Sequence, residues 1–145
     1  MEDLIAVVLA AGKGTRMKTD KAKVVHKIYG KEMIARVIET AMRAGIKDIV
    51  TVVGHKREDV EAVLGDSVTY AYQEELLGTG HTTMQAIPYL KDKKGKVVIL
   101  YGDVPIVRPE TLQKLIAKSI KEGEHATVLT AMVPNPTRIW KNNKR

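Results

Sequence analysis

Short runs of apolar and β-branched residues recur along the chain, at positions 4–10, 49–53, 68–72, 96–101 and 126–132. A continuous apolar run of this length suits a strand that is buried on both faces, because a half-exposed strand would alternate apolar and polar residues. Residues 24–29 also look extended and are followed by a turn at Gly30 and Lys31. The pattern therefore predicts five strands and one short extended segment.

Helical spacing fills the segments between these runs. From Met33 to Ala44 the apolar residues recur every three or four positions, and Gly45 suits the position just after a helix. A helix that begins at Pro109 and ends at Gly123 has the same spacing, and proline is favoured in a first helical turn. We expect two further helices at 57–64 and from about Gly80 to Ala86, the latter stopping near Pro88.

Strands and helices alternate throughout, which is typical of an α/β fold with a mostly parallel sheet and helices on both faces, a Rossmann-like three-layer arrangement. In such sheets ligands bind beyond the carboxyl ends of the strands. Three glycine-rich segments, 11–14, 78–80 and 102–105, each follow a predicted strand. We therefore expect the three segments to converge on one edge of the sheet.

Composition excludes several classes of protein. The 145 residues suit one domain, and 44% are hydrophobic and 28% charged, as in ordinary globular proteins. No cysteine is available for disulfides or thiolate chemistry, and no apolar run is long enough to span a membrane. The acidic N-terminus does not resemble a signal peptide. A cytoplasmic protein without a membrane partner is expected.

The net charge of +7 does not indicate nucleic-acid binding. Residues 138–145 contain four cations and no acid, which leaves +3 of the +7 for the rest of the chain. In residues 1–137 acids and bases are interspersed, and no basic surface interleaved with aromatic residues can be recognised. We predict no nucleic-acid partner.

The segment after the first strand, Ala11-Gly12-Lys13-Gly14-Thr15, is suited to binding phosphates. Glycines let backbone N–H groups approach an anion, and Arg16 and Lys23 follow as cations. A P-loop would need Ser or Thr directly after Lys13, and a dinucleotide fingerprint would need a glycine in place of Met17. What remains is a polyphosphate-binding loop of another kind.

Two side chains beyond this loop suggest chemistry. Asp103 follows a buried strand and is positioned to hold Mg²⁺ together with substrate phosphates, although a turn aspartate bonded to its own backbone is the alternative. Gln73 offers a donor and an acceptor that match the edge of a pyrimidine base. The four histidines lack the spacing of metal ligands, and His81 alone lies within a motif-like loop.

Four motifs occur in the order in which sugar-phosphate nucleotidyltransferases carry them. They are Leu9-Ala10-Ala11-Gly12-x-Gly14-Thr15-Arg16-Met17, Lys23-Val24-Val25-His26, Gln73 with Leu77-Gly78-Thr79-Gly80-His81, and Leu100-Tyr101-Gly102-Asp103-Val104-Pro105. Together they closely resemble the N-acetylglucosamine-1-phosphate uridylyltransferase domain of bifunctional bacterial enzymes. The resemblance covers most of the chain. The motifs Leu77-Gly78-Thr79-Gly80-His81 and Tyr101-Gly102-Asp103-Val104-Pro105 distinguish the uridylyl branch from relatives that use CTP or molybdopterin.

The resemblance implies a role for each matching residue. It places Gln73, Gly78 and Thr79 at the uracil, and Asp103 on Mg²⁺. Arg16 and Lys23 would contact the phosphates and, with Asp103, form the catalytic set. The remaining nucleotide-binding positions are Leu9, Ala10, Ala11, Gly12, Gly14, Tyr101 and Gly102.

The chain departs from the family pattern after Thr137. The family has a Gly-Tyr-Gly turn before its Arg-Ile pair, whereas here Thr137 runs directly into Arg138 and Ile139. We therefore divide the chain into a nucleotide-binding part at 1–137 and a divergent basic tail at 138–145. Relative to the family, the chain looks truncated before the sugar-binding half, which contains a second metal ligand. A sheet that stops after five strands leaves an open edge, which favours self-association.

The resemblance implies transfer of UMP from UTP to N-acetylglucosamine 1-phosphate, with Mg²⁺ as cofactor, to give pyrophosphate and UDP-N-acetylglucosamine, a peptidoglycan precursor. Because the positioning of the sugar depends on residues that this chain lacks, we expect impaired turnover. Three alternatives stay open. One is a nucleotide-binding module without catalysis, and another is a transferase for another nucleotide or sugar phosphate. The third is nucleic-acid binding through the basic tail at 138–145.

Overall fold

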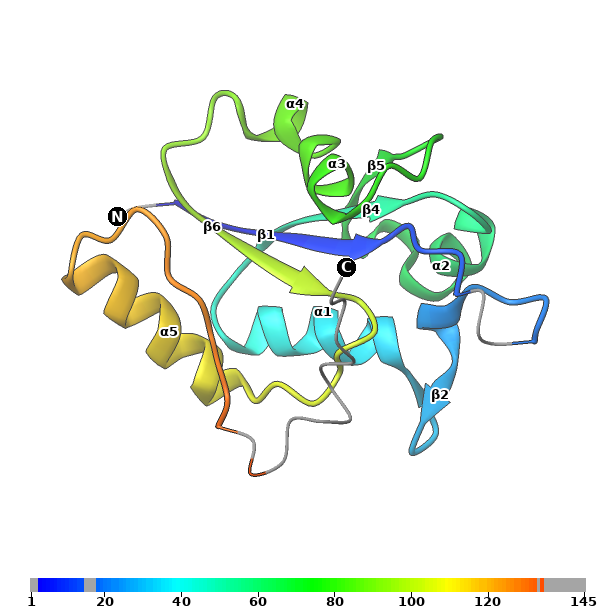
Figure 1. The fold of residues 1–145 in the computed structure, drawn as a ribbon, viewed down its shortest axis with the longest axis horizontal. Helices are drawn as coiled ribbons and strands as arrows, with labels where there is room; N and C mark the ends of the chain where they lie inside the picture. The colour runs from blue at the N-terminus through cyan, green and yellow to red at the C-terminus, as the bar shows by residue number, and fades with distance from the viewer. Residues whose placement is uncertain (1–2, 15–17, 133, 135–145) are drawn as a thin grey trace, which may run out of the picture. The chain divides into compact units, whose positions relative to one another are not determined.

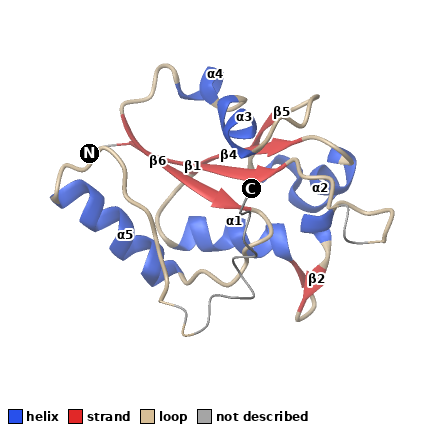
Figure 2. Cartoon of the chain, in the orientation of Figure 1, coloured by secondary structure: helices blue, strands red, loops and turns tan. Residues whose placement is uncertain are grey.

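A parallel four-stranded sheet is the centre of the first of two compact units, residues 1–113, in the computed structural model (Figures 1 and 2). The structure describes residues 3–14, 18–132 and 134. The strands are β1 (Asp3–Ala10), β4 (Asp48–Val53), β5 (Thr69–Tyr72) and β6 (Gly95–Tyr101), in the order β5-β4-β1-β6. All three pairings are parallel, which confirms the predicted sheet and four of its five strands.

The apolar character of β1 follows from its position between two neighbouring strands and two helical layers. Residues 5–10 are all buried, with at most 9% of any side chain exposed. Ile5, Val7 and Leu9 face one layer, where they form a cluster with Ala86 and Leu90. Because side chains alternate along a strand, Ala6, Val8 and Ala10 face the other layer.

Helices cover both faces of this sheet. Figure 1 shows α3 (Thr79–Met84) and α4 (Ile87–Leu90) on the opposite side from α1 (Met33–Arg43). The helix α2 (Arg57–Leu64) packs beside α1. The three-layer α/β fold predicted from the sequence is confirmed.

The ends of the helices are set by glycine and proline. Gly45 follows α1 with φ of +97°, and the N–H of Ile46 donates to the carbonyl of Ala41, which is the expected C-terminal arrangement. Pro88 has a different role from the one predicted. It lies in the first turn of α4, where the missing N–H is tolerated, and α3 ends at Met84.

The predicted extended segment 24–29 is only partly correct. Residues Lys23–Val25 form the 3-10 turn η1 and bury Val24 and Val25. A two-stranded hairpin of β2 (Lys27–Ile28) and β3 (Lys31–Glu32) follows. The ring Nδ1 of His26 supports this turn, since it lies 3.2 Å and 3.0 Å from the carbonyl oxygens of Ala22 and Lys23.

The second unit, residues 114–145, contains the later part of α5 (Pro109–Lys121) and a turn at Gly123 with φ of +63°. The fifth strand predicted at 126–132 is wrong, because these residues are irregular and Val128 and Met132 are largely exposed. A strand is stable only when its backbone groups pair with a neighbour, and this segment pairs with none of the described strands. The basic tail 138–145 lies outside the described residues.

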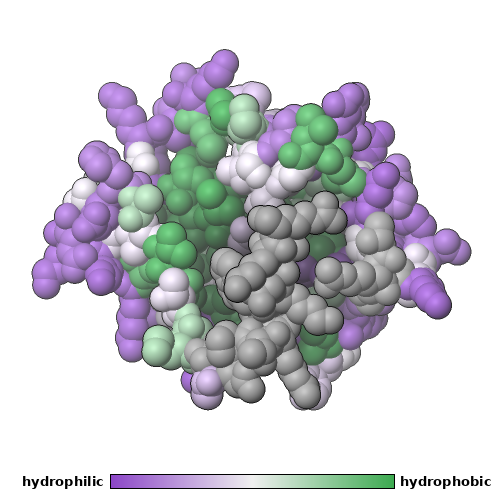
Figure 3. All heavy atoms as spheres, viewed as in Figure 1, coloured by the Kyte–Doolittle hydropathy of each residue, from purple (hydrophilic) through white to green (hydrophobic). Residues whose placement is uncertain are grey.

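One face of β6 remains apolar and open. Val97, Ile99 and Tyr101 are each about half exposed, and they share the face of the sheet that bears α3. Figure 3 shows hydrophobic residues gathered where β6 and β1 lie in Figure 1, with hydrophilic residues around them. Among the described residues, no helix has both the length and the apolar character that a membrane crossing requires.

Candidate nucleotide-binding site

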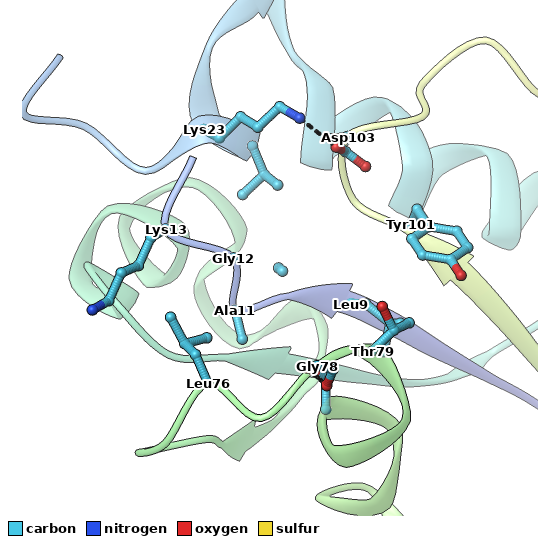
Figure 4. A pocket seen from close by; sticks show the side chains of 13 residues that line it. Leu9, Ala11, Gly12, Lys13, Lys23, Leu76, Gly78, Thr79, Tyr101 and Asp103 are labelled. Atoms are coloured by element: carbon cyan, nitrogen blue, oxygen red, sulfur yellow. Dashed lines mark hydrogen bonds and ion pairs between the residues drawn. The ribbon is translucent and has the colours of Figure 1, made fainter. Parts of the chain in front are cut away.

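The carboxyl ends of β1 and β6 open into a pocket of about 360 Å³, which is within the usual range for small-molecule sites (Figure 4). All three glycine-rich segments contribute to it, as the topology of the sheet predicts. The lining residues are Leu9, Ala10, Ala11, Gly12, Lys13, Lys23, Val24, Leu76, Gly78, Thr79, Thr82, Tyr101 and Asp103.

The loop after β1 combines open space with one tight contact. A Cβ at Gly12 would meet no atom within 4 Å, so the backbone there is accessible to a ligand. Gly14 has φ of +57°, and a Cβ on it would lie 2.7 Å from the Cβ of Lys23. The glycine loop therefore packs directly on the stem of Lys23. Arg16 lies outside the described residues, and its role stays a prediction.

An ion pair crosses the pocket. The Nζ of Lys23 donates to Oδ2 of Asp103 at 2.6 Å, and the two side chains are 42% and 34% exposed. Figure 4 shows that the side chain of Lys13, which also lines the pocket, points away from this pair. The two residues that the sequence singled out for phosphate and metal thus contact each other directly.

The backbone that carries Lys23 is fixed by residues that the sequence did not reveal. The N–H of Ala22 donates to Oδ2 of Asp59 on α2 at 2.7 Å. One residue before that helix, the ammonium of Lys56 donates to the carbonyl of Asp20. Both contacts join positions far apart in the chain, so no local motif announces them. They tie the segment before Lys23 to the start of α2.

Gly102 connects the ends of β1 and β6. Its N–H donates to the carbonyl of Leu9 at 2.9 Å, which extends the hydrogen bonding of the sheet into the loop that carries Asp103. A Cβ there would lie 2.8 Å from Cδ1 of Ile34 and 3.0 Å from the oxygen of Leu9. A larger residue would therefore require its neighbours to shift, and Tyr101 and Asp103 on either side of Gly102 line the pocket.

Gln73 is placed behind the pocket wall and is not among the lining residues. Its side chain is 4% exposed, and its Oε1 accepts a hydrogen bond from the hydroxyl of Thr82 at 2.7 Å. Its Nε2 lies 2.8 Å from Nδ1 of His81, which gives that histidine a structural contact. The amide keeps one N–H and one lone pair for a further partner, so a direct contact to a base stays a prediction.

Gly78 and Thr79, at the start of α3, form another wall of the pocket. Gly78 has φ of +96° and precedes the first residue of α3, so the chain turns sharply into the helix at the pocket edge. The hydroxyl of Thr82 also lies 3.1 Å from the carbonyl of Gly78, which joins this turn to Gln73. Leu76, which the sequence analysis did not select, adds an apolar surface beside them.

Asp103 is the one acidic residue among those lining this pocket in the described part of the chain. The described residues contain no group of three or more histidines and acids that could hold a metal by themselves. A single carboxylate fits a Mg²⁺ ion that keeps water ligands and shares phosphate oxygens with a substrate. The donor set therefore suits an ion that the free chain holds weakly and that is held more tightly once a nucleotide adds phosphate oxygens.

Comparisons with known proteins agree with this architecture. The profile of the MobA-like NTP transferase domain matches residues 6–143. The bifunctional protein GlmU of Acetivibrio thermocellus is 51% identical over 136 residues, which are 94% of this chain and 30% of that protein. The chain thus spans about 30% of the length of this curated relative, and corresponds to its N-terminal region.

Solved structures show the same fold at low sequence identity. A nucleotidyl transferase from Methanothermobacter thermautotroptrophicus is 24% identical with a TM-score of 0.67, over 79% of this chain and 57% of its own. The complex of Rv0371c from Mycobacterium tuberculosis with manganese is 22% identical with a TM-score of 0.67, over 80% and 59%. With its pocket at the carboxyl ends of a parallel sheet and a family match over nearly its whole length, the chain belongs to the MobA-like NTP transferase domains.

Proposed function

We propose that this chain binds UTP with Mg²⁺ in the pocket described above and acts as a sugar-phosphate uridylyltransferase. The observation that carries the proposal is the arrangement of the glycine loop, the Lys23–Asp103 pair and the Gly78 turn around one cavity. Uridine and N-acetylglucosamine 1-phosphate are the nucleoside and the acceptor that the resemblance of the four sequence motifs implies. A nucleoside triphosphate substrate would place the reaction in the cytoplasm.

The phosphates would occupy the space over the glycine loop. Backbone N–H groups between Ala10 and Gly14 can approach oxygen atoms closely, because Gly12 leaves this side of the loop open. Lys23 and Arg16 supply the positive charge that pyrophosphate needs as it leaves. Lys13, exposed at the rim, adds to the attraction of the pocket for a polyanion.

The base would lie against the wall formed by Leu76, Gly78 and Thr79. An exposed apolar side chain and an open glycine backbone suit the faces and edge of a planar base. Gln73, held behind this wall by Thr82 and His81, would have to turn toward the pocket to present its remaining N–H and lone pair to the base. Tyr101 and Gly102 would then lie near the ribose.

Asp103 would hold the metal. Mg²⁺ is the ion that we propose, since a carboxylate and phosphate oxygens are its usual ligands, and a fold relative is known as a manganese complex. When bound, the ion would neutralise phosphate charge during transfer. The chain's own residues would orient the triphosphate so that a phosphate oxygen of the acceptor attacks the α-phosphorus and pyrophosphate departs.

Calorimetric titration of the chain with UTP, CTP, ATP and GTP, each with Mg²⁺, tests the proposal. We expect UTP to bind at least about tenfold more tightly than CTP, because a base that presents the wrong hydrogen-bonding edge leaves polar groups unpaired. Turnover with N-acetylglucosamine 1-phosphate is measured next. Selective binding without turnover would favour a nucleotide-binding module, and equal binding of all four nucleotides would contradict the base site.

Replacing Gly12 with alanine is expected to weaken UTP binding by at least about tenfold, which corresponds to the loss of one hydrogen bond to a charged group. The free energy of unfolding should hardly change, because the new methyl group meets no protein atom within 4 Å. Calorimetry and urea unfolding measure the two quantities. Unchanged UTP affinity would mean that the phosphates do not lie over this loop.

A further inference from the structure

The Lys23–Asp103 ion pair occupies the atoms that nucleotide and metal both require. The Nζ of Lys23 lies 2.6 Å from Oδ2 of Asp103. A divalent ion on the same oxygen would stand at about 2.0–2.6 Å from it. A metal on Oδ2 would therefore compete with the ammonium for this oxygen, and on either oxygen its like charge would repel the nearby ammonium. The pair and a metal-bound Asp103 are alternative states of the pocket.

The stem of Lys23 is held while its end is able to move. Asp59 fixes the backbone N–H of Ala22, and Gly14 packs against the Cβ of Lys23. The side chain is nevertheless 42% exposed, so the ammonium can leave Asp103 without entering an apolar environment. A lysine anchored in this way can swing between the carboxylate and the glycine loop that contacts its own stem.

We propose that Lys23 is a resident counter-cation of Asp103, which a divalent ion displaces when phosphate groups at the glycine loop take over the lysine. In the free chain the pair neutralises both charges. In the loaded chain the metal neutralises Asp103, and the phosphates neutralise Lys23. The exchange makes metal binding and phosphate binding mutually dependent, as linkage requires of any two ligands that favour the same state. The inference rests on the proposed function and deepens it.

Metal binding to the free chain tests the competition directly. Titration with Mn²⁺, followed by electron paramagnetic resonance, compares the wild-type chain with Lys23→Met and Lys13→Met. We expect Lys23→Met to bind Mn²⁺ about fivefold more tightly, a factor typical of one removed ion pair at a partly exposed site. Lys13→Met is the matched control, because it removes the same charge from the same pocket without touching Asp103.

Asp103→Asn and the double variant Asp103→Asn with Lys23→Met complete a double-mutant cycle. Asp103→Asn should lose the Mn²⁺ site, and adding Lys23→Met to it should then have no effect. Equal Mn²⁺ affinity of wild type and Lys23→Met, or an equal gain in Lys13→Met, would overturn the exchange. Absence of Mn²⁺ binding in every chain would overturn it as well, together with the metal role of Asp103.

UTP binding in the presence of EDTA is a second test of the exchange. Without metal, Asp103→Asn should bind UTP several-fold more tightly than wild type, because Lys23 no longer has to leave a carboxylate. A merely structural role of the pair predicts weaker binding instead, and that result would overturn the exchange. Failure of wild type to bind UTP even with Mg²⁺ would contradict the proposed function, while the Mn²⁺ titration still decides the fate of the ion pair.

Discussion

Replacing Gly102 with alanine is expected to lower the free energy of unfolding by about 3 kcal/mol, near the upper end of the cost of overpacking. The added methyl group would lie 2.8 Å from Cδ1 of Ile34, 3.0 Å from the carbonyl oxygen of Leu9 and 3.2 Å from Cγ1 of Val24. Ile34 is fully buried, and the oxygen of Leu9 belongs to the central strand. The Cδ1 of Ile34 can move only into the packed core, and the oxygen of Leu9 cannot move without disturbing the sheet. Urea unfolding followed by circular dichroism measures the change.

The control for this variant is Gly12→Ala, which adds the same methyl group to another glycine in the same pocket. No atom lies within 4 Å of the position of its Cβ, so its stability should match that of wild type. A loss of stability that is equal in the two variants would contradict the packing argument. Together the pair of variants separates a glycine required by the fold from one required by the ligand.

Replacing Asp103 with asparagine is expected to weaken UTP binding in the presence of Mg²⁺ by about 10- to 100-fold, the range seen when the support of a bound metal is weakened. The amide has nearly the same size as the carboxylate but no negative charge to hold the ion. Calorimetry with saturating Mg²⁺ measures the change, and Asp92→Asn, an exposed acid outside the pocket, is the control.

Removing the metal with EDTA should reverse the direction in which Asp103→Asn changes the affinity for UTP. With Mg²⁺ the variant loses a metal ligand and should bind UTP more weakly, whereas without metal it frees Lys23 and should bind more tightly. Unchanged affinity with Mg²⁺ would show that Asp103 is a turn residue, which is the alternative that its sequence context leaves open.

The central architecture could be predicted because its signals are local. The run from Leu4 to Ala10 is apolar without interruption, and β1 is buried on both faces as a consequence. Parallel strands place their carboxyl ends together, so the meeting of Gly12, Gly78 and Asp103 in one pocket follows from topology alone. Helix α1 likewise ends at Arg43, just before Gly45, close to where its spacing and the glycine predict.

The errors arise where tertiary partners decide the outcome. Residues 126–132 have strand character, but strand formation needs a neighbouring edge, and none is paired to this segment in the described structure. Val24 and Val25 are buried by a turn that His26 stabilises, and this contact cannot be read from β-branched residues. The bond from Ala22 to Asp59 joins separate elements and leaves no pattern in the sequence.

Gln73 differs from the prediction in the direction of its side chain. Its donor and acceptor groups and the family resemblance predicted a residue at the base, and its N–H continues the ladder of β5 by donating to Val53. The side chain, however, is held by Thr82 and His81 behind the wall. Sequence motifs fix where the backbone passes, whereas the direction of a polar side chain depends on which partners the fold provides.

The central place of β1 determines when the pocket can form. The strand at the beginning of the chain pairs with β4 on one side and with β6, from the far part of the unit, on the other. Lys23 and Asp103 are 80 positions apart, and contacts of such separation form late because a long loop must be closed first. During synthesis the sheet β5-β4-β1 can assemble before residues 95–101 leave the ribosome. A pocket that contains both Lys23 and Asp103 therefore requires β6, and until β6 pairs, β1 presents the unpaired backbone N–H and C=O groups of an open sheet edge.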